Sequence, residues 1–191
     1  MAISSNIHDV NVPVDCPVTL SIGATGGSGN YSYQWQIQYD DNDWANITHE
    51  SYNGAQTDTL SFEAKTNRNG YQYRCIVTDS NADTVISNEI LLSLVLAIEI
   101  QPENIITYVD CPVELTIMAS SPNGKPNYQW QIKFDNNDWA NITHESYSGI
   151  QTETLRFTAQ PNRNGYKYRC IVSDNDGNSI TSKEITLKII K

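Results

Sequence analysis

The sequence predicts an all-β protein of two tandem antiparallel β-sandwich domains, with about seven strands in each. Two observations predict this fold. Apolar and polar residues alternate with a period of two along several short runs, which is typical of strands buried on one face. The whole pattern then recurs about 95 residues later, so the same domain is expected over residues 1–95 (repeat one) and again over 96–191 (repeat two).

Three strings of sequence establish the repeat. Val14–Val18 recurs as Val109–Val113, Tyr33–Ile37 as Tyr128–Ile132, and Asn67–Tyr71 as Asn162–Tyr166. About 60 per cent of positions between Val14 and Leu92 match their partners, a self-similarity typical of repeat arrays. Met1 followed by two whole repeats is what an excerpt from a longer array would show, and a complete small cytosolic protein is the alternative.

The strands follow in order along each repeat. In repeat one the alternating runs are Val18–Ile22, Tyr33–Tyr39, Leu60–Glu63, Tyr71–Thr78 and Glu89–Leu94. Clusters of Gly, Asn and Asp, such as Gly26–Asn30, separate these runs and tolerate the backbone angles of turns. No stretch keeps a helical period for three turns, so strands account for the regular structure.

The order of the special residues resembles the immunoglobulin fold. Trp35 lies in one long strand, and Tyr73-Arg74-Cys75 follows about 40 residues later, after a loop that ends in Asn-Gly. More closely, the strings Tyr-Gln-Trp-Gln, Trp44–Ile47 and Gly70–Cys75 resemble the immunoglobulin-like repeats of bacterial surface proteins. The resemblance implies that Trp35 is the core Trp of strand C and that Tyr73 is the tyrosine-corner residue before the strand-F Cys. Trp130, Tyr168 and Cys170 take the same roles in repeat two.

The resemblance also bears on the cysteines. It places the usual partner of Cys75 near Ile22, whereas Cys16 lies six residues earlier, or roughly 20 Å along a strand. A disulfide needs Cα atoms within about 7 Å, so we expect the four cysteines to be unbonded. Bonded pairs Cys16–Cys75 and Cys111–Cys170 are the alternative. The expected structural core comprises Ile22, Trp35, Tyr73, Cys75, Ile117, Trp130, Tyr168 and Cys170.

Charge and hydropathy exclude several classes of function. The chain has 12 Lys and Arg against 22 Asp and Glu, a net charge of −10, which disfavours binding to nucleic acid. Repeat one has 3 basic and 11 acidic residues (−8), and repeat two has 9 and 11 (−2). No apolar run reaches the roughly 18 to 20 residues of a membrane span, so none is expected in this segment.

The sequence contains no recognisable catalytic or metal-binding pattern. Its only histidines are His8, His49 and His144, and the spacings typical of zinc sites and phosphate-binding loops are missing. We therefore expect no enzyme activity, no catalytic residue, no metal and no cofactor.

One segment stands out as a candidate contact site. Residues 42–52 are identical to residues 137–147, although other turns differ between the repeats. Because Tyr and His often anchor interfaces, the candidate binding residues are His49, Glu50 and Tyr52 with their copies His144, Glu145 and Tyr147. A recent duplication with a purely structural connection would also explain the identity.

The sequence therefore predicts a non-enzymatic repeat module of a secreted or cell-surface bacterial protein, extracellular and part of a larger chain. It would act in adhesion or binding, or as a stalk segment. The expected partners are a host or cell-surface protein or glycan, together with neighbouring immunoglobulin-like repeats. Three alternatives stay open: specific binding of a host protein such as an antibody or mucosal glycoprotein, a carbohydrate-binding accessory domain, and a phage-surface immunoglobulin-like decoration.

Overall fold

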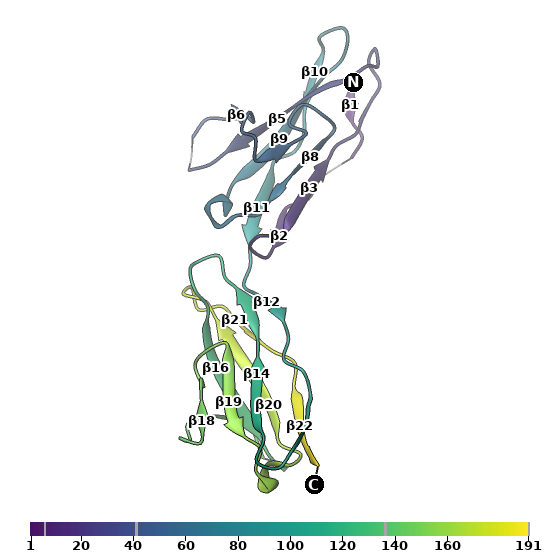
Figure 1. The fold of residues 1–191 in the computed structure, drawn as a ribbon. Helices are drawn as coiled ribbons and strands as arrows, with labels where there is room; N and C mark the ends of the chain where they lie inside the picture. The colour runs from purple at the N-terminus through teal and green to yellow at the C-terminus, as the bar shows by residue number, and fades with distance from the viewer. Residues whose placement is uncertain (6, 41, 136, 191) are drawn as a thin grey trace. The chain divides into compact units, whose positions relative to one another are not determined.

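A computed structural model describes residues 1–5, 7–40, 42–135 and 137–190. The chain divides into two compact units, Met1–Val95 and Leu96–Lys191 (Figure 1). Each unit is an antiparallel β-sandwich of the immunoglobulin type, which confirms the predicted fold class.

Unit one has a larger sheet in the order β2-β11-β9-β5-β6, with β10 also paired to β9. A smaller sheet has the order β3-β8-β7, and β1 pairs with β4. The bounds are β1 Ala2–Ile3, β2 Val10–Val12, β3 Pro17–Ser21, β4 Ala24–Thr25, β5 Ser32–Gln38, β6 Ala45–Asn46, β7 Tyr52–Asn53, β8 Thr59–Glu63, the 3-10 turn η1 Thr66–Arg68, β9 Gln72–Thr78, β10 Thr84–Ile86 and β11 Ile90–Leu94.

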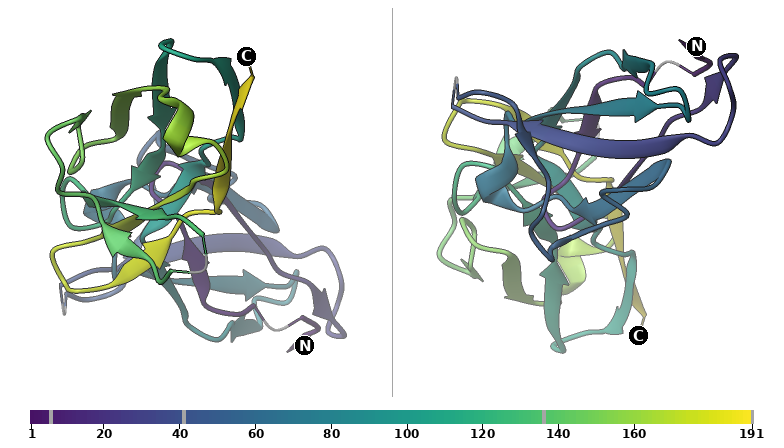
Figure 2. Two further views of the ribbon diagram at one scale, coloured as in Figure 1. Left: turned by 90° about the horizontal axis from the view of Figure 1, so that it is seen from below. Right: turned by 90° about the horizontal axis from the view of Figure 1, so that it is seen from above.

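Unit two repeats this arrangement, with sheets β13-β22-β20-β16-β17 and β14-β19-β18 and the pair β12-β15. Its single turn of 3-10 helix, η2, is the short green coil in the left-hand view of Figure 2. The bounds are β12 Ala97–Ile100, β13 Ile105–Tyr108, β14 Pro112–Thr116, β15 Met118–Ser120, β16 Asn127–Lys133, β17 Ala140–Asn141, β18 Tyr147–Ser148, β19 Thr154–Thr158, η2 Pro161–Arg163, β20 Lys167–Ser173, β21 Ser179–Thr181 and β22 Ile185–Ile190.

The described strands outnumber the predicted seven because long strands are interrupted. β10 and β11 both pair with β9, and Ser87 lies between them. The Ser87 hydroxyl accepts the N–H of Cys75 at 2.9 Å, and the Ser87 N–H donates to the Cys75 carbonyl at 2.9 Å. The Ser87 side chain thus satisfies a backbone N–H of β9 at the point where the strand is interrupted. Both β10 and β11 therefore stay paired with β9.

The first and last strands of each larger sheet are parallel neighbours. β2 pairs with β11 from Val10↔Leu92 to Val12↔Leu94, and β13 pairs with β22 in the same sense. The other paired strands are antiparallel. Alternation along β9 buries Tyr73, Cys75 and Val77, as a half-buried strand requires.

The core of each unit surrounds a fully buried tryptophan. The Trp35 indole N–H donates to the Thr57 carbonyl at 3.0 Å, and Trp130 makes the same bond to Thr152. These bonds satisfy the polar atom of an otherwise apolar side chain. The following residues, all expected in the core, are buried: Ile22, Trp35, Tyr73, Cys75, Ile117, Trp130, Tyr168 and Cys170.

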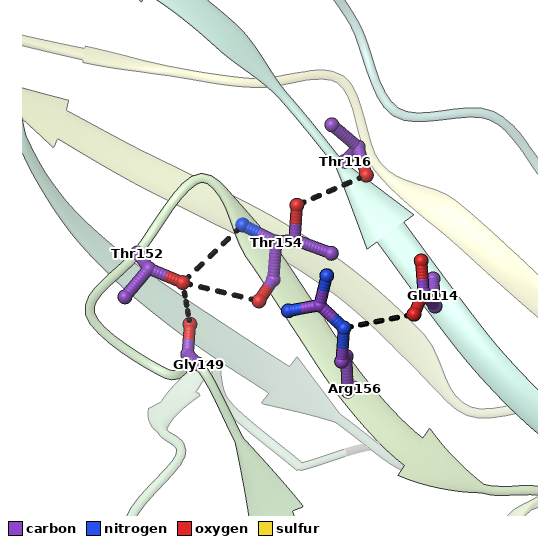
Figure 3. Close-up of polar contacts among 6 residues, drawn as sticks. All are labelled: Glu114, Thr116, Gly149, Thr152, Thr154 and Arg156. Atoms are coloured by element: carbon purple, nitrogen blue, oxygen red, sulfur yellow. Dashed lines mark hydrogen bonds and ion pairs between the residues drawn. The ribbon is translucent and has the colours of Figure 1, made fainter.

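A tight turn follows β18 in unit two (Figure 3). Gly149 has a φ of +70°, and a Cβ there would collide with the Thr154 carbonyl oxygen. The Thr152 hydroxyl lies 3.1 Å from the carbonyl oxygens of both Gly149 and Thr154. Beside the turn, the Arg156 guanidinium donates to Glu114 at 2.8 Å and links β19 to β14 (Figure 3). This turn fixes where the chain goes after the candidate segment.

Candidate functional site

The segment of residues 42–52 begins on the edge of the larger sheet. β6 pairs with β5 through Asn46↔Gln36 and Ala45↔Ile37. Ile47 is then buried, and its N–H donates to the Trp35 carbonyl at 3.0 Å. The buried isoleucine anchors the segment, so the residues after it leave the sheet from a fixed point.

His49 organises the turn that follows. Its Nδ1 accepts the N–H of Ser51 at 3.1 Å and lies 2.9 Å from the Ser51 hydroxyl, while its carbonyl accepts the N–H of Tyr52 at 3.1 Å. Because Nδ1 accepts a backbone N–H, the neutral ring carries its proton on Nε2, which is then free to donate. The His49 and Glu50 side chains are exposed.

Tyr52 is half-buried and packs toward the core. Its ring lies 5.1 Å from the Phe62 ring, centroid to centroid, and its hydroxyl lies 3.3 Å from the Tyr73 hydroxyl. Burial raises the pKa of Tyr52, and raises that of Tyr73 further because Tyr73 is more deeply buried. Tyr52 therefore has a packing role as well as any contact role.

The hydroxyl bond differs from the one that the resemblance implies. A tyrosine corner directs its hydroxyl to the backbone a few residues upstream. Here the Tyr73 hydroxyl meets the side chain of Tyr52, and the Tyr168 hydroxyl meets Tyr147 at 3.3 Å. The tyrosine-corner role is thus corrected: the neighbouring tyrosine of the candidate segment supplies the polar partner.

Arg68 completes the arrangement, and sequence reasoning assigned it no role. It is the last residue of η1 and is only 8% exposed. Its guanidinium lies 4.3 Å from the centroid of the Tyr52 ring and 5.5 Å from that of Phe62. It donates to the Ser51 hydroxyl at 2.6 Å and to the Glu63 carbonyl at 2.7 Å. Arg68 therefore joins the candidate segment to the turn between β8 and β9.

The same contacts recur in unit two. The Arg163 guanidinium lies 4.4 Å from the Tyr147 ring centroid and donates to the Ser146 hydroxyl at 2.6 Å. His144 Nδ1 accepts the Ser146 N–H at 3.1 Å. His144 and Glu145 are exposed, and Tyr147 and Arg163 are half-buried. The sequence contained one indication that Arg68 has a role, because the string Asn67–Tyr71 recurs unchanged in repeat two. The contact of Arg68 with Ser51 and Tyr52 could not be predicted, because Arg68 lies in a polar turn far from them in sequence.

A hollow of about 450 Å³ lies beside these residues in unit one. We call it the arginine hollow. Its lining includes Tyr39, Asn46, Thr48, His49, Arg68 and Tyr71. Tyr39 and Tyr71 stack with ring centroids 5.1 Å apart. Of the candidate residues, His49 and Tyr52 line the hollow, and Glu50 is exposed outside it.

A second set of polar contacts covers the outer face of the same sheet. The Arg74 guanidinium lies 4.2 Å from the Trp44 ring and donates to Gln36 at 2.8 Å, and Gln36 donates to Asn46 at 2.9 Å. In unit two, Arg169 lies 4.3 Å from the Trp139 ring and donates to Gln131. The polar side chains satisfy one another's hydrogen-bonding groups. The Arg74 guanidinium also covers the Trp44 ring, which explains why Trp44 is half-buried.

The turn after β9 differs between the repeats. In unit one Asp79 accepts the N–H groups of Ser28, Asn81 and Asp83 at 2.9 to 3.1 Å. These bonds, the one from Ser28 above all, hold the pKa of Asp79 below its ordinary value. Asp174 of unit two instead bonds within its own turn, mainly to Asn178.

The four cysteines Cys16, Cys75, Cys111 and Cys170 are free thiols. Cys75 and Cys170 are buried, and desolvation raises the pKa of each to about 12. Cys16 and Cys111 are half-buried and precede β3 and β14. A buried thiol with a raised pKa is a poor nucleophile, which makes Cys75 and Cys170 packing residues.

Within the described part of the chain, the structure has no group of three or more His, Cys, Asp or Glu residues that could hold a metal ion. Over the same residues, none of the helical segments has the length and apolar character needed to cross a bilayer.

No protein-family model matches the chain, and no curated sequence matches it. Solved structures of tandem immunoglobulin domains are similar to it. Domains 3–5 of Drosophila OTK align over 100% of this chain and 62% of that chain, at 16% identity and a TM-score of 0.46. The tandem Ig repeats of Dlar align over 99% and 97%, at 18% and 0.41, and Sidekick-1 domains 1–5 over 98% and 39%, at 12% and 0.45. The chain thus spans less than two thirds of the OTK and Sidekick-1 segments, and this distant likeness carries no inference about ligands.

Proposed function

We propose that the chain is a non-enzymatic binding module of a secreted or cell-surface bacterial protein, with one recognition site in each repeat. The site is the exposed part of residues 42–51 around His49 and the arginine hollow, together with its copy around His144. The partner is a host or cell-surface protein or glycan. Bacterial origin and extracellular location rest on the resemblance of the sequence strings to bacterial surface repeats.

One observation carries this proposal. The contacts of Arg68 with Ser51 and Tyr52 recur at Arg163 within 0.1 Å, although the turns after β9 and β20 have changed their bonding. Two equal sites on one chain raise the effective concentration of the second contact once the first has formed. Weak single contacts would then give strong attachment.

The test measures binding of the full chain to immobilised host glycoproteins, antibodies and glycans. The variant H49A/E50A/H144A/E145A removes the exposed candidate side chains and keeps Tyr52 and Tyr147, whose rings pack on Phe62 and Phe157. We expect binding to fall at least about tenfold, with an unchanged melting temperature. H49A/E50A alone leaves one site, so it should lose the gain from two-site attachment.

The matched control is E89Q/E184Q, which removes the same number of negative charges. Glu89 and Glu184 are exposed and precede β11 and β22, which two strands separate from β6 and β17 in the sheet order. E184Q also breaks the exposed ion pair of Glu184 with Lys167, a surface contact of small energetic weight. Binding that is equally weak in the control, or that survives in the segment variant, would contradict the proposed site. A chain that binds no member of the panel would favour the stalk interpretation.

A further inference from the structure

We propose that the arginine hollow binds a sugar that carries a carboxylate, such as a hexuronic acid. This inference rests on the proposed function, because it names the ligand of the same site. It goes further by assigning Arg68 and Arg163 as the groups that recognise the carboxylate.

Arg68 carries a buried positive charge whose described hydrogen bonds include no carboxylate. The described hydrogen bonds of the Arg68 guanidinium are to neutral groups, the Ser51 hydroxyl and the Glu63 carbonyl. The ion pairs found among the described residues involve Lys65, Arg156 and Lys167. Arg68 is only 8% exposed as a residue, a buried charge is costly when unpaired, and the Tyr52 ring offsets only part of that cost. Its remaining N–H donors suit a planar carboxylate.

The size and polarity of the arginine hollow suit a sugar. Its volume of about 450 Å³ is within the range of small-molecule sites and suits one or two sugar rings. Asn46, Thr48 and Asn67 bring amide and hydroxyl groups to the lining, and His49 brings an imidazole. Such groups match the hydroxyls of a sugar, whereas a purely ionic site would not need them.

The residues that line the arginine hollow recur in unit two. Every lining residue of the hollow is identical in repeat two except Tyr39, which is replaced by Phe134. The stack survives the exchange, since the Phe134 and Tyr166 centroids lie 5.2 Å apart against 5.1 Å for Tyr39 and Tyr71. The ring is kept while its hydroxyl is lost. An apolar face for the C–H groups of a sugar needs only the ring.

The experiment titrates the full isotope-labelled chain with methyl glucuronide and with the neutral methyl glucoside, and follows the ring signals of His49 and His144 by NMR. We expect the glucuronide to shift both signals and the glucoside to bind at least about tenfold more weakly, because it lacks the charged acceptor. R68Q should abolish the His49 response and leave the His144 response as an internal control, and R163Q should do the reverse.

Two additions keep the test decisive if R68Q destabilises unit one. N67A changes an exposed lining residue and leaves the arginine packing intact, so it should weaken the glucuronide response at His49 alone. Repeat one carries −8 and repeat two −2, so His144 should report the tighter site at low salt, and the two affinities should converge at high salt.

Equal binding of glucuronide and glucoside would overturn the role of the arginine. Stronger binding of an acetylated peptide with a free C-terminal carboxylate would overturn the sugar as ligand, and an absence of shifts with every probe would overturn the site. Each of these results leaves the proposed function intact if H49A/E50A/H144A/E145A still abolishes binding to the immobilised panel. If that variant binds normally, the proposed function fails as well.

Discussion

The hydroxyl of Tyr52 lies 3.3 Å from the hydroxyl of Tyr73, and this bond ties the candidate segment to the middle of the core. Removal of either hydroxyl leaves the other buried without its partner. We expect Y52F and Y73F each to lower the free energy of unfolding of unit one by about 1–2 kcal/mol. The double variant Y52F/Y73F should cost less than the sum of the two, as measured by denaturant unfolding. Strict additivity would show that the two hydroxyls do not interact.

Gly54 and Gly149 follow the candidate segments and have a backbone conformation that other residues rarely adopt. Their φ angles are +80° and +70°, and an added Cβ would strike the carbonyl oxygens of Thr59 and Thr154. We expect G54A and G149A each to destabilise its own unit by about 1–3 kcal/mol or more. G70A is the control, because a Cβ there meets open space and only the backbone strain remains. Equal losses at Gly54 and Gly70 would show that the collision is relieved.

The thiols are predicted to react in two classes. Iodoacetamide under native conditions should label Cys16 and Cys111 and spare Cys75 and Cys170, because the latter pair is buried. In denaturant without reductant, intact mass should show labels on all four thiols. A protein that takes up no label in denaturant would contain the bonded pairs Cys16–Cys75 and Cys111–Cys170.

The buried thiols also predict alkaline sensitivity. Burial raises the pKa of Cys75 and Cys170 to about 12 from 9.0 for an ordinary thiol. The stabilisation is therefore fully present below pH 9 and is lost as the pH rises from 9 toward 12, because only the unfolded chain releases these protons. Thermal unfolding at a series of pH values should show a steeper decline for the natural chain than for C75A/C170A. Parallel declines would assign the alkaline loss to other groups.

The lowered pKa of Asp79 predicts an acid dependence in unit one that extends to the loop containing Ser28. Its pKa is lowered in the folded chain, so its stabilising effect is present above the ordinary value of 3.8 and is lost as the pH falls through the lower folded pKa. D79N should accelerate amide hydrogen exchange at Ser28, Asn81 and Asp83 at neutral pH, because the carboxylate accepts all three N–H groups. D174N should accelerate exchange at Asp176 and Asn178, whose N–H groups the Asp174 carboxylate accepts. The loop before β16 should respond less than the loop at Ser28 does, because it is bonded through Asn123 to Asn175 and Asp176 and not to Asp174 itself. Unchanged exchange at Ser28 in D79N would contradict the predicted link.

The fold was predictable because apolar and polar residues alternate along β9, and this pattern can be read from the sequence. The sequence also places a tryptophan, Trp35, in the neighbouring strand, and the structure buries it fully. The packing of Arg68 was not, since its partners Ser51 and Glu63 lie 17 and 5 residues away and meet it only in the folded sandwich. An arginine in a polar turn is ordinarily read as exposed. The partner of Tyr73 was missed for a similar reason, because the family pattern directs attention to the backbone and not to a half-buried tyrosine.

The parallel pairing of β2 with β11 determines how a repeat responds to mechanical tension. Once the two-residue pair of β1 with β4 has been released, a pull transmitted through the chain acts on the N-terminal end of Val10–Val12 and on the C-terminal end of Ile90–Leu94. Parallel neighbours place those two ends at opposite ends of the ladder, so the force slides one strand along the other and loads its hydrogen bonds together. An antiparallel pair pulled from one end would unzip bond by bond. Each repeat is therefore built to resist shear along its parallel strand pair.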